Sequence, residues 1–166
     1  MGIQIGFPLL IYNYVLDLKE YYMREKKAGL IPYYYDEKTK SYKYLFMVSS
    51  DPKFGGPRPM ISKGTAEDGE ELFIAAIREA QEELGFIKEN TDGSYIRIYD
   101  EHVILRSGYE YDLTIFAVRI SDRKMFDKPG FETKYTVWMT NESFSKKGRK
   151  DHAPIVNFLE NHLCQN

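Results

Sequence analysis

Cysteine is nearly absent from this sequence, because Cys164 is the only one among 166 residues. A single thiol has no partner within the chain, so a framework of intramolecular disulfides is excluded. Chains without disulfides are typical of reducing compartments, and we therefore expect a cytoplasmic protein. Positive charge is also not in excess, and the net charge of −2 gives no general electrostatic attraction to nucleic acids or anionic membranes.

Long apolar runs are missing as well. A membrane-spanning helix needs about 20 apolar residues, whereas Asn13 and Asp17 interrupt the apolar start of this chain, which also lacks the basic opening of a signal peptide. We expect no membrane partner. Residues 10–24 are predicted to form an amphipathic helix, and residues 1–26 an N-terminal helical extension whose stripe suits a homodimer contact. The stripe consists of Tyr14, Val15, Leu18, Tyr21 and Tyr22.

The rest of the chain predicts one α/β domain over residues 1–166, without repeats or low-complexity linkers. Apolar and β-branched stretches predict strands at 28–36, 42–50, 94–100, 102–107, 111–120 and 132–140. Helical spacing predicts one central helix and a closing helix from about Asp151, with Ile155, Phe158, Leu159 and Leu163 on one face. This order of elements indicates a central mixed sheet covered by helices.

The central helix carries a cluster of acids along the edge of its apolar face. At about 100° per residue, the apolar side chains between Leu72 and Leu84 fill one arc of roughly 140°. Glu79 and Glu83 fall within about 20° of that arc and Glu82 roughly 60° further round, while Arg78 points to the exposed back. Carboxylates held this close repel one another and raise one another's pKa unless a cation offsets them.

Two interpretations fit this cluster. A helix rich in glutamate can simply present a solvated face. Alternatively, the carboxylates bind a hard divalent cation such as Mg²⁺ or Mn²⁺, which prefers carboxylate oxygens and leaves positions open for substrate phosphates.

The residues around the cluster resemble the complete Nudix box, from Gly64 to Phe86. Gly64 is followed after five residues by Glu70, and after seven more by Arg78-Glu79-Ala80-Gln81-Glu82-Glu83-Leu84-Gly85-Phe86. This matches Gly-x5-Glu-x7-Arg-Glu-U-x-Glu-Glu-x-Gly-U, where U is a bulky apolar residue. Seven fixed identities arise by chance on the order of 10⁻⁸ per window. The resemblance implies a Nudix-type α/β/α sandwich.

The resemblance also implies an activity. Nudix hydrolases cleave a nucleoside diphosphate linked to another group X by attack of water at phosphorus, with Mg²⁺ or Mn²⁺ as cofactor. Glu79, Glu82 and Glu83 would be the metal ligands, with the carbonyl group of Lys63 or Gly64 as a further one, and Glu79 would be a candidate general base. Arg78 would orient a glutamate, and Glu70 would be mainly structural. Gly64 is expected to permit a turn, and Gly85 to end the helix.

Candidate residues outside the box are fewer. Lys63 and Arg58 are the cations nearest in sequence to the metal loop, and Lys63 is the preferred phosphate contact. Glu110 and Glu132 are either alternative bases or surface acids. Tyr109, Tyr111 and Phe131 either stack on a nucleobase or pack at the rim of the core, and Trp138 is expected in the core. The basic turn "KKGRKDH", which contains His152, is expected to be solvated.

The sequence leaves the substrate open. A nucleoside diphosphate derivative with an adenosine moiety is the best generic statement, and a small-molecule nucleotide is the expected partner. Nucleic acid is not expected, apart from a capped RNA end. The alternative function is a non-catalytic Nudix-fold module that binds a nucleotide or regulates a partner without hydrolysis.

Overall fold

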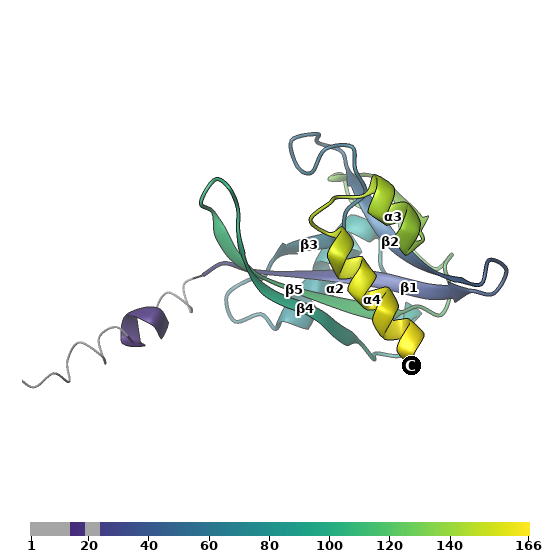
Figure 1. The fold of residues 1–166 in the computed structure, drawn as a ribbon, viewed down its shortest axis with the longest axis horizontal. Coiled ribbons are helices and arrows are strands. Elements are labelled where there is room, and N and C mark those ends of the chain that lie inside the picture. The colour runs from purple at the N-terminus through teal and green to yellow at the C-terminus, as the bar shows by residue number, and fades with distance from the viewer. Residues whose placement is uncertain (1–13, 19–23) are drawn as a thin grey trace, which may run out of the picture.

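The computed structural model of the chain describes residues 14–18 and 24–166. Residues 14–18 are helical, with exposed side chains that include Tyr14 and Val15 (Figure 1). The rest of the helix predicted over 10–24, including Tyr21 and Tyr22, lies outside the described residues. The proposed role of residues 1–26 in a homodimer therefore stays a prediction.

Six strands form one mixed sheet, and β1 at its centre runs parallel to β5 and antiparallel to β2 and β3. The order across the sheet is β4-β5-β1-β2-β6, with β3 paired to β1. β3 pairs with the first half of β1, and β2 pairs with the second half. The segment that begins at Gly64 therefore starts beside the centre of the sheet. The strands are β1 (Lys26–Asp36), β2 (Ser41–Ser49), β3 (Ser62–Thr65), β4 (Ile96–Ile104), β5 (Glu110–Arg119) and β6 (Thr133–Met139).

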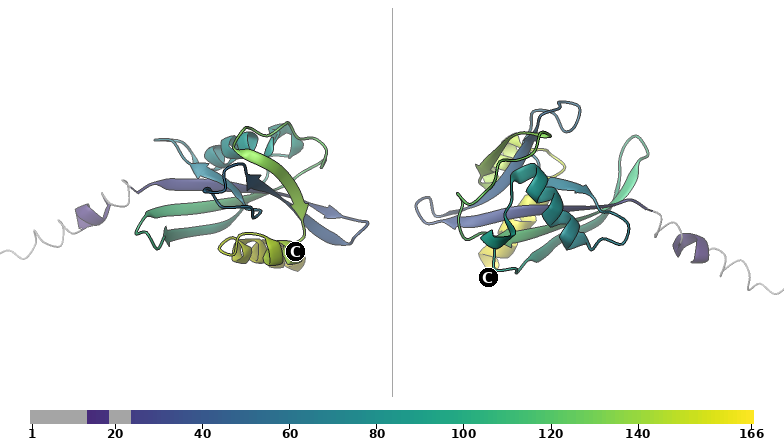
Figure 2. Two further views of the ribbon diagram at one scale, coloured as in Figure 1. Left: turned by 90° about the horizontal axis from the view of Figure 1, so that it is seen from above. Right: turned by 180° about the vertical axis from the view of Figure 1, so that it is seen from behind.

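Helices cover both faces of this sheet, which confirms the predicted α/β/α sandwich. Helix α2 (Leu72–Leu84) lies on one face, and α3 (Asn141–Lys147) and α4 (Ala153–Gln165) lie on the other (Figure 2). A short 3-10 turn at Lys88–Asn90 follows α2. Within the described ranges, no helix combines the length and apolar character that crossing a bilayer requires.

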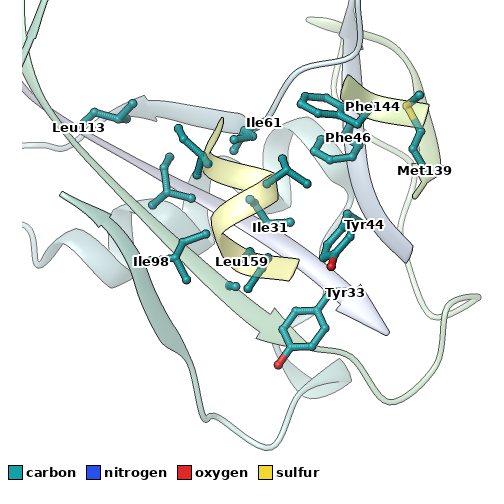
Figure 3. Packing of buried hydrophobic residues seen from close by; sticks show 14 of the residues in the cluster. Ile31, Tyr33, Tyr44, Phe46, Ile61, Ile98, Leu113, Met139, Phe144 and Leu159 are labelled. Carbon is teal, nitrogen blue, oxygen red and sulfur yellow. The ribbon is translucent and has the colours of Figure 1, made fainter. Parts of the chain in front are cut away.

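The core has two halves, one on each side of the sheet, because successive side chains of a strand point to opposite faces. Ala28 and Leu30 of β1 pack with α2, whereas Ile31 and Tyr33 pack with α3 and α4. Figure 3 shows Phe46 and Phe144 on the second side, where their rings stack with centroids 3.9 Å apart. The buried face of α2 is rich in alanine, since Ala75, Ala76 and Ala80 are all fully buried.

The structure differs from the sequence-based prediction in three respects: the extent of one strand, the presence of one helix and the exposure of one side chain. The stretches 94–100 and 102–107 form one strand, since Glu101 continues the pairing of β4 with Leu113. Helix α3 was not predicted; its first turn is capped by Thr140, whose side chain accepts a hydrogen bond from the Ser143 amide at 3.1 Å. Phe158 is exposed rather than buried, because Val156 takes the place on the buried face beside Ile155 and Leu159.

The expectation of a solvated basic turn before α4 holds for Lys146, Lys147 and Lys150, which are exposed, but it is wrong for His152. His152 is 2% exposed, and its Nδ1 accepts a hydrogen bond of 3.1 Å from the amide of Ile61. Burial lowers the pKa of His152 to about 3, an effect that the positive charges of Lys63 and Arg149 strengthen and Asp151 opposes. The neutral ring thus ties the start of α4 to the entry of β3.

We expect this buried histidine to make the fold sensitive to acid. The folded-state pKa of His152 lies below the ordinary value of 6.5, so the unfolded chain binds the proton more tightly. Its contribution is complete above about pH 6.5 and falls by about 1.4 kcal/mol for each pH unit below that, until the folded-state pKa is reached. Urea unfolding between pH 7 and pH 5 measures this loss.

The control is His152→Asn, whose side-chain oxygen can accept the Ile61 amide without titrating in this range. The variant should be less stable at pH 7 but should lose less stability on acidification than the wild type. Equal losses in the two proteins would show that His152 does not titrate as described.

Candidate active site

The end of α2 is fixed by the segment that leads into β6. The helix ends at Gly85, whose φ of 68° is left-handed, and a Cβ there would lie 1.8 Å from the carbonyl oxygen of Asp127. The Gly130 amide donates to the carbonyl of Glu82 at 2.6 Å, and the Thr133 hydroxyl donates to that of Glu83 at 2.7 Å. These bonds satisfy carbonyls that have no partner within the helix. The last turn, which carries two of the candidate ligands, is therefore held in place.

Gly64 lies within strand β3, paired with Ala28, and not at the turn that the sequence suggested. Its importance is the space beside it. A Cβ at this position would lie 2.0 Å from Cδ of Glu79, so the missing side chain leaves the volume that the Glu79 carboxylate fills. The first glycine of the box thus brings β3 into direct contact with α2.

Arg78 forms hydrogen bonds with Glu70, which precedes α2, and with Glu79, which lies within α2. Its Nη1 donates to Oε1 of Glu79 at 2.7 Å, while Nε and Nη2 donate to Glu70 at 3.0 and 2.9 Å. Nη2 also reaches the carbonyl of Thr65 at 3.0 Å. The side chain is 29% exposed, so it does not extend from the exposed back of the helix as expected. Arg78 thus contacts Glu79, one of the glutamates of the box, and its orienting role stays a prediction.

Glu70 is held by its neighbours before the helix begins. Its carboxylate accepts a bond from the Glu67 amide at 2.9 Å in addition to the two from Arg78. These bonds lower the pKa of Glu70. Glu70 precedes α2, whose first turn contains no acidic residue. Glu70 therefore acts through Arg78 and the loop.

Glu83 is the most deeply buried of the three candidate ligands. Its Oε2 accepts a bond of 2.9 Å from the backbone amide of Lys63. Burial raises the pKa of Glu83 to about 7, and the negative charge of Glu79 adds to this rise. Burial likewise raises the pKa of Glu79, although Arg78 opposes it. The ionised form of both groups is thus disfavoured where they stand.

This donor set fits a divalent cation in its chemistry. Glu79 and Glu83 are partly buried carboxylates whose ionised form is disfavoured by burial. A nearby cation would stabilise that form. Glu82 is exposed at the same end of the helix and adds to the negative potential at Glu79. In the described part of the chain, however, no three acidic, histidine or cysteine side chains converge on one point. Glu79 accepts a bond from Arg78, and Glu83 accepts one from the Lys63 amide.

A pocket of about 870 Å³ opens beside Glu83. Its walls come from the loop between β2 and β3, the tip of the β4–β5 hairpin, the segment before β6 and the turn between α3 and α4. Figure 1 shows the hairpin tip and the β2–β3 loop projecting toward the upper edge of the view. Of the three glutamates only Glu83 lines this pocket, and Glu79 and Glu82 do not. The acidic end of α2 therefore contacts the pocket through Glu83.

Aromatic side chains form the rim. Phe131 is 91% exposed and Phe54 is 73% exposed, and both line the pocket. Tyr109 and Tyr111 lie on the hairpin side, with the Lys27 ammonium 5.4 and 4.8 Å from their ring centres. Exposed apolar rings that gather at one site can mark a ligand-binding groove. Trp138, by contrast, is half-buried and packs edge-on against Tyr34.

The charged candidate residues outside the box differ in whether they line the pocket. Lys63 and Glu132 line the pocket, whereas Arg58 is exposed and does not. Burial lowers the pKa of Lys63, helped by the nearby charges of Arg149 and Lys27. Glu110 lies away from the pocket lining and pairs with His102 at 2.9 Å.

Sequence reasoning missed Arg149, which lines the pocket in place of Arg58. The only signal for it was the basic turn "KKGRKDH", whose charge did not reveal which side chain turns inward.

No protein of curated function matches the chain in sequence, whereas several solved structures share its fold. Among solved structures, an Ap4A hydrolase binary complex from C. elegans has a TM-score of 0.69 at 18% identity, covering 86% of this chain and 99% of that one. The NUDIX domain of Shewanella oneidensis NrtR, complexed with ADP ribose, has a TM-score of 0.66 at 12% identity, with 96% and 99% covered. The Nudix hydrolase RenU from M. smegmatis has a TM-score of 0.65 at 15% identity, with 86% and 88% covered.

These identities are low, so the three structures establish a shared fold and nothing about the substrate. The family is established separately, because the NUDIX domain model matches residues 25–159. That range contains the whole box from Gly64 to Phe86, both halves of the core and the pocket. The chain therefore belongs to the Nudix family.

Proposed function

We propose that the protein is a metal-dependent pyrophosphohydrolase that cleaves the diphosphate linkage of a nucleoside diphosphate derivative by attack of water at phosphorus. The observation that carries the proposal is the intact acidic end of α2. Glu79 fills the space that Gly64 leaves beside β3, while Glu83 accepts the Lys63 amide of the same strand and lines the pocket. Burial disfavours the ionised form of these carboxylates, and the pocket beside them is large and lined partly by cations. This combination is typical of a functional site.

Each residue has a distinct part in this proposal. Glu79, Glu82 and Glu83 would hold Mg²⁺ or Mn²⁺, with the main chain of Gly64 as an additional oxygen donor, and Glu79 is the candidate base. When bound, such an ion neutralises phosphate charge and lowers the pKa of water. Arg78 holds the Glu79 carboxylate by a bond of 2.7 Å. Lys63 carries its charge into the pocket beside Glu83, where a phosphate oxygen would lie.

The test is a substrate panel assayed with Mg²⁺, with Mn²⁺ and with a chelator. The panel comprises dinucleoside polyphosphates, ADP-ribose, NADH, nucleotide sugars, capped RNA and modified nucleoside triphosphates. We expect release of phosphate-containing products from at least one class, and its loss in the chelator. Running the reaction in ¹⁸O-labelled water identifies the phosphorus that water attacks. Absence of turnover on the whole panel with either metal would remove the proposal.

A binding or regulatory module is the second candidate, because the carboxylates do not converge as they stand. Tight nucleotide binding by calorimetry without product release would favour it. A small-molecule nucleotide is the expected partner under both proposals, and the capped RNA in the panel tests the one nucleic-acid partner considered. Light scattering tests the proposed homodimer. The single exposed Cys164 fits the proposed cytoplasmic location.

A further inference from the structure

The turn between α3 and α4 is anchored at two points to the segment that enters β3. The Arg149 amide donates to the carbonyl of Pro59 at 2.9 Å, and the Ile61 amide donates to the buried ring of His152 at 3.1 Å. Two residues of the turn are thus fixed relative to the strand that carries Lys63. An arginine in such a turn has a defined position rather than the freedom of a surface loop.

The Arg149 side chain is fixed as well. Its Nε and Nη2 donate to the two oxygens of Asp151 at 3.0 and 2.7 Å, a bidentate arrangement that sets the plane of the guanidinium. Nη1 has no hydrogen-bond partner among the described residues. It lies 3.6 Å from the point where a Cβ on Gly55 would stand, so the glycine leaves room on that side. Arg149 lines the pocket, whereas Asp151 does not.

The pocket lining contains one more cationic side chain than acidic side chains. Lys27, Lys53, Lys63 and Arg149 line it, against Asp51, Glu83 and Glu132. Glu83 belongs to the proposed metal site, and Asp51 accepts a bond from the Lys53 amide at 2.9 Å. Lys63 is the proposed contact for a phosphate at the acids, which leaves Lys27, Lys53 and Arg149 for further phosphates. The volume of about 870 Å³ is near the upper end of the range for small-molecule sites, roughly 300–1,000 Å³.

We propose that Arg149, positioned by Asp151, binds phosphates beyond the cleaved anhydride, so that the site prefers substrates with a chain of three or more phosphates. This inference rests on the proposed hydrolytic function, which it makes more specific. Nη1 of Arg149, without a hydrogen-bond partner among the described residues, would bind the additional phosphates. Lys27 lines the same pocket, and its ammonium also lies 3.7 Å from Oε1 of Glu25. Asp151 is a positioning residue, since it reaches the substrate only through the guanidinium.

The experiment compares dinucleoside polyphosphates bridged by two, three and four phosphates. We expect kcat/KM of the wild type to rise with the number of phosphates. Arg149→Gln should lower kcat/KM for the tetraphosphate by about 10- to 100-fold, mainly through KM, because charge-assisted bonds to substrate are lost away from the reacting atoms. The effect on the two-phosphate compound should be less than about twofold, since that chain ends before Arg149.

Two further variants separate position from charge. Asp151→Asn should produce a weaker effect with the same dependence on chain length, because the guanidinium is retained but less well fixed; a merely structural role would weaken all substrates equally. Arg97→Gln removes an exposed arginine of β4 that does not line the pocket and should change nothing. A wild type without chain-length preference, or an Arg149→Gln variant equally impaired on all three substrates, would overturn the inference.

A binding measurement keeps the inference separate from the proposed function. Calorimetry with inorganic tripolyphosphate and with pyrophosphate, in the presence of chelator, requires no turnover. The wild type should bind tripolyphosphate about 10-fold more tightly than Arg149→Gln does, and pyrophosphate should show no such difference. If the substrate panel shows no hydrolysis while this difference is present, the hydrolase proposal fails and the anion site stands. If hydrolysis occurs and the difference is absent, the reverse holds.

Discussion

Replacing Glu79 or Glu82 by glutamine is expected to lower kcat by about 10²- to 10⁴-fold while leaving the fold intact. Each substitution keeps the size of the side chain and removes its negative charge. If the end of α2 holds divalent ions against a diphosphate, the loss of one charge weakens both the ion and its effect on the attacking water. Glu79 loses in addition its proposed role as base.

The structure explains why stability should change little. Glu82 is exposed, and its backbone carbonyl, which accepts the Gly130 amide, is unaffected by the substitution. At Glu79 burial already disfavours the charge, and Arg78 keeps its two bonds to Glu70 after the change. We expect changes in the free energy of unfolding below about 1 kcal/mol.

Initial rates on the preferred substrate and urea unfolding measure the two effects. Glu89→Gln is the matched control, because Glu89 is an exposed glutamate of the neighbouring 3-10 turn. Rates of Glu79→Gln and Glu82→Gln close to that of the control would refute a catalytic role for these acids, whatever the fold of the chain.

The sequence predicted best those features whose residues are close together along the chain. The apolar face of α2 and its end at Gly85 follow from spacing along the chain, and the structure confirms them. The box likewise brought Glu79, Glu82 and Glu83 to one end of one helix. Helix α3 was missed because seven residues are too few for a periodic signal and its cap is a single threonine.

Features that depend on contacts between distant segments could not be predicted. The burial of His152 requires the Ile61 amide, and the position of Arg149 requires the Pro59 carbonyl, both far away in sequence. Arg58 is nearer to the box along the chain, yet the pocket is lined by Arg149. The role of Gly64 was mistaken for a similar reason, since a turn is a local feature and a close approach of two elements is not.

Gly64→Ala is expected to lower kcat by at least about 100-fold, since misplacement of a reacting group by about 1 Å has an effect of that size. A Cβ at position 64 would lie 2.0 Å from Cδ and 2.2 Å from Oε2 of Glu79, so the carboxylate has to leave its present position. Turning away also breaks the bond from Arg78 to Glu79. The backbone of residue 64 is in strand β3 without a positive φ, so alanine introduces no conformational strain of its own.

A double-mutant cycle shows whether this loss passes through Glu79. In a Glu79→Gln background the base and its charge are already absent, so adding Gly64→Ala should cost much less than it does in the wild type. Additive losses would mean that alanine disturbs the site by another route, for instance by separating β3 from α2. In that case Lys63, whose amide bonds to Glu83 from the same strand, would be displaced as well, and the affinity for pyrophosphate would fall together with kcat. Unchanged pyrophosphate binding with a lower kcat therefore identifies Gly64 as the residue that makes room for Glu79.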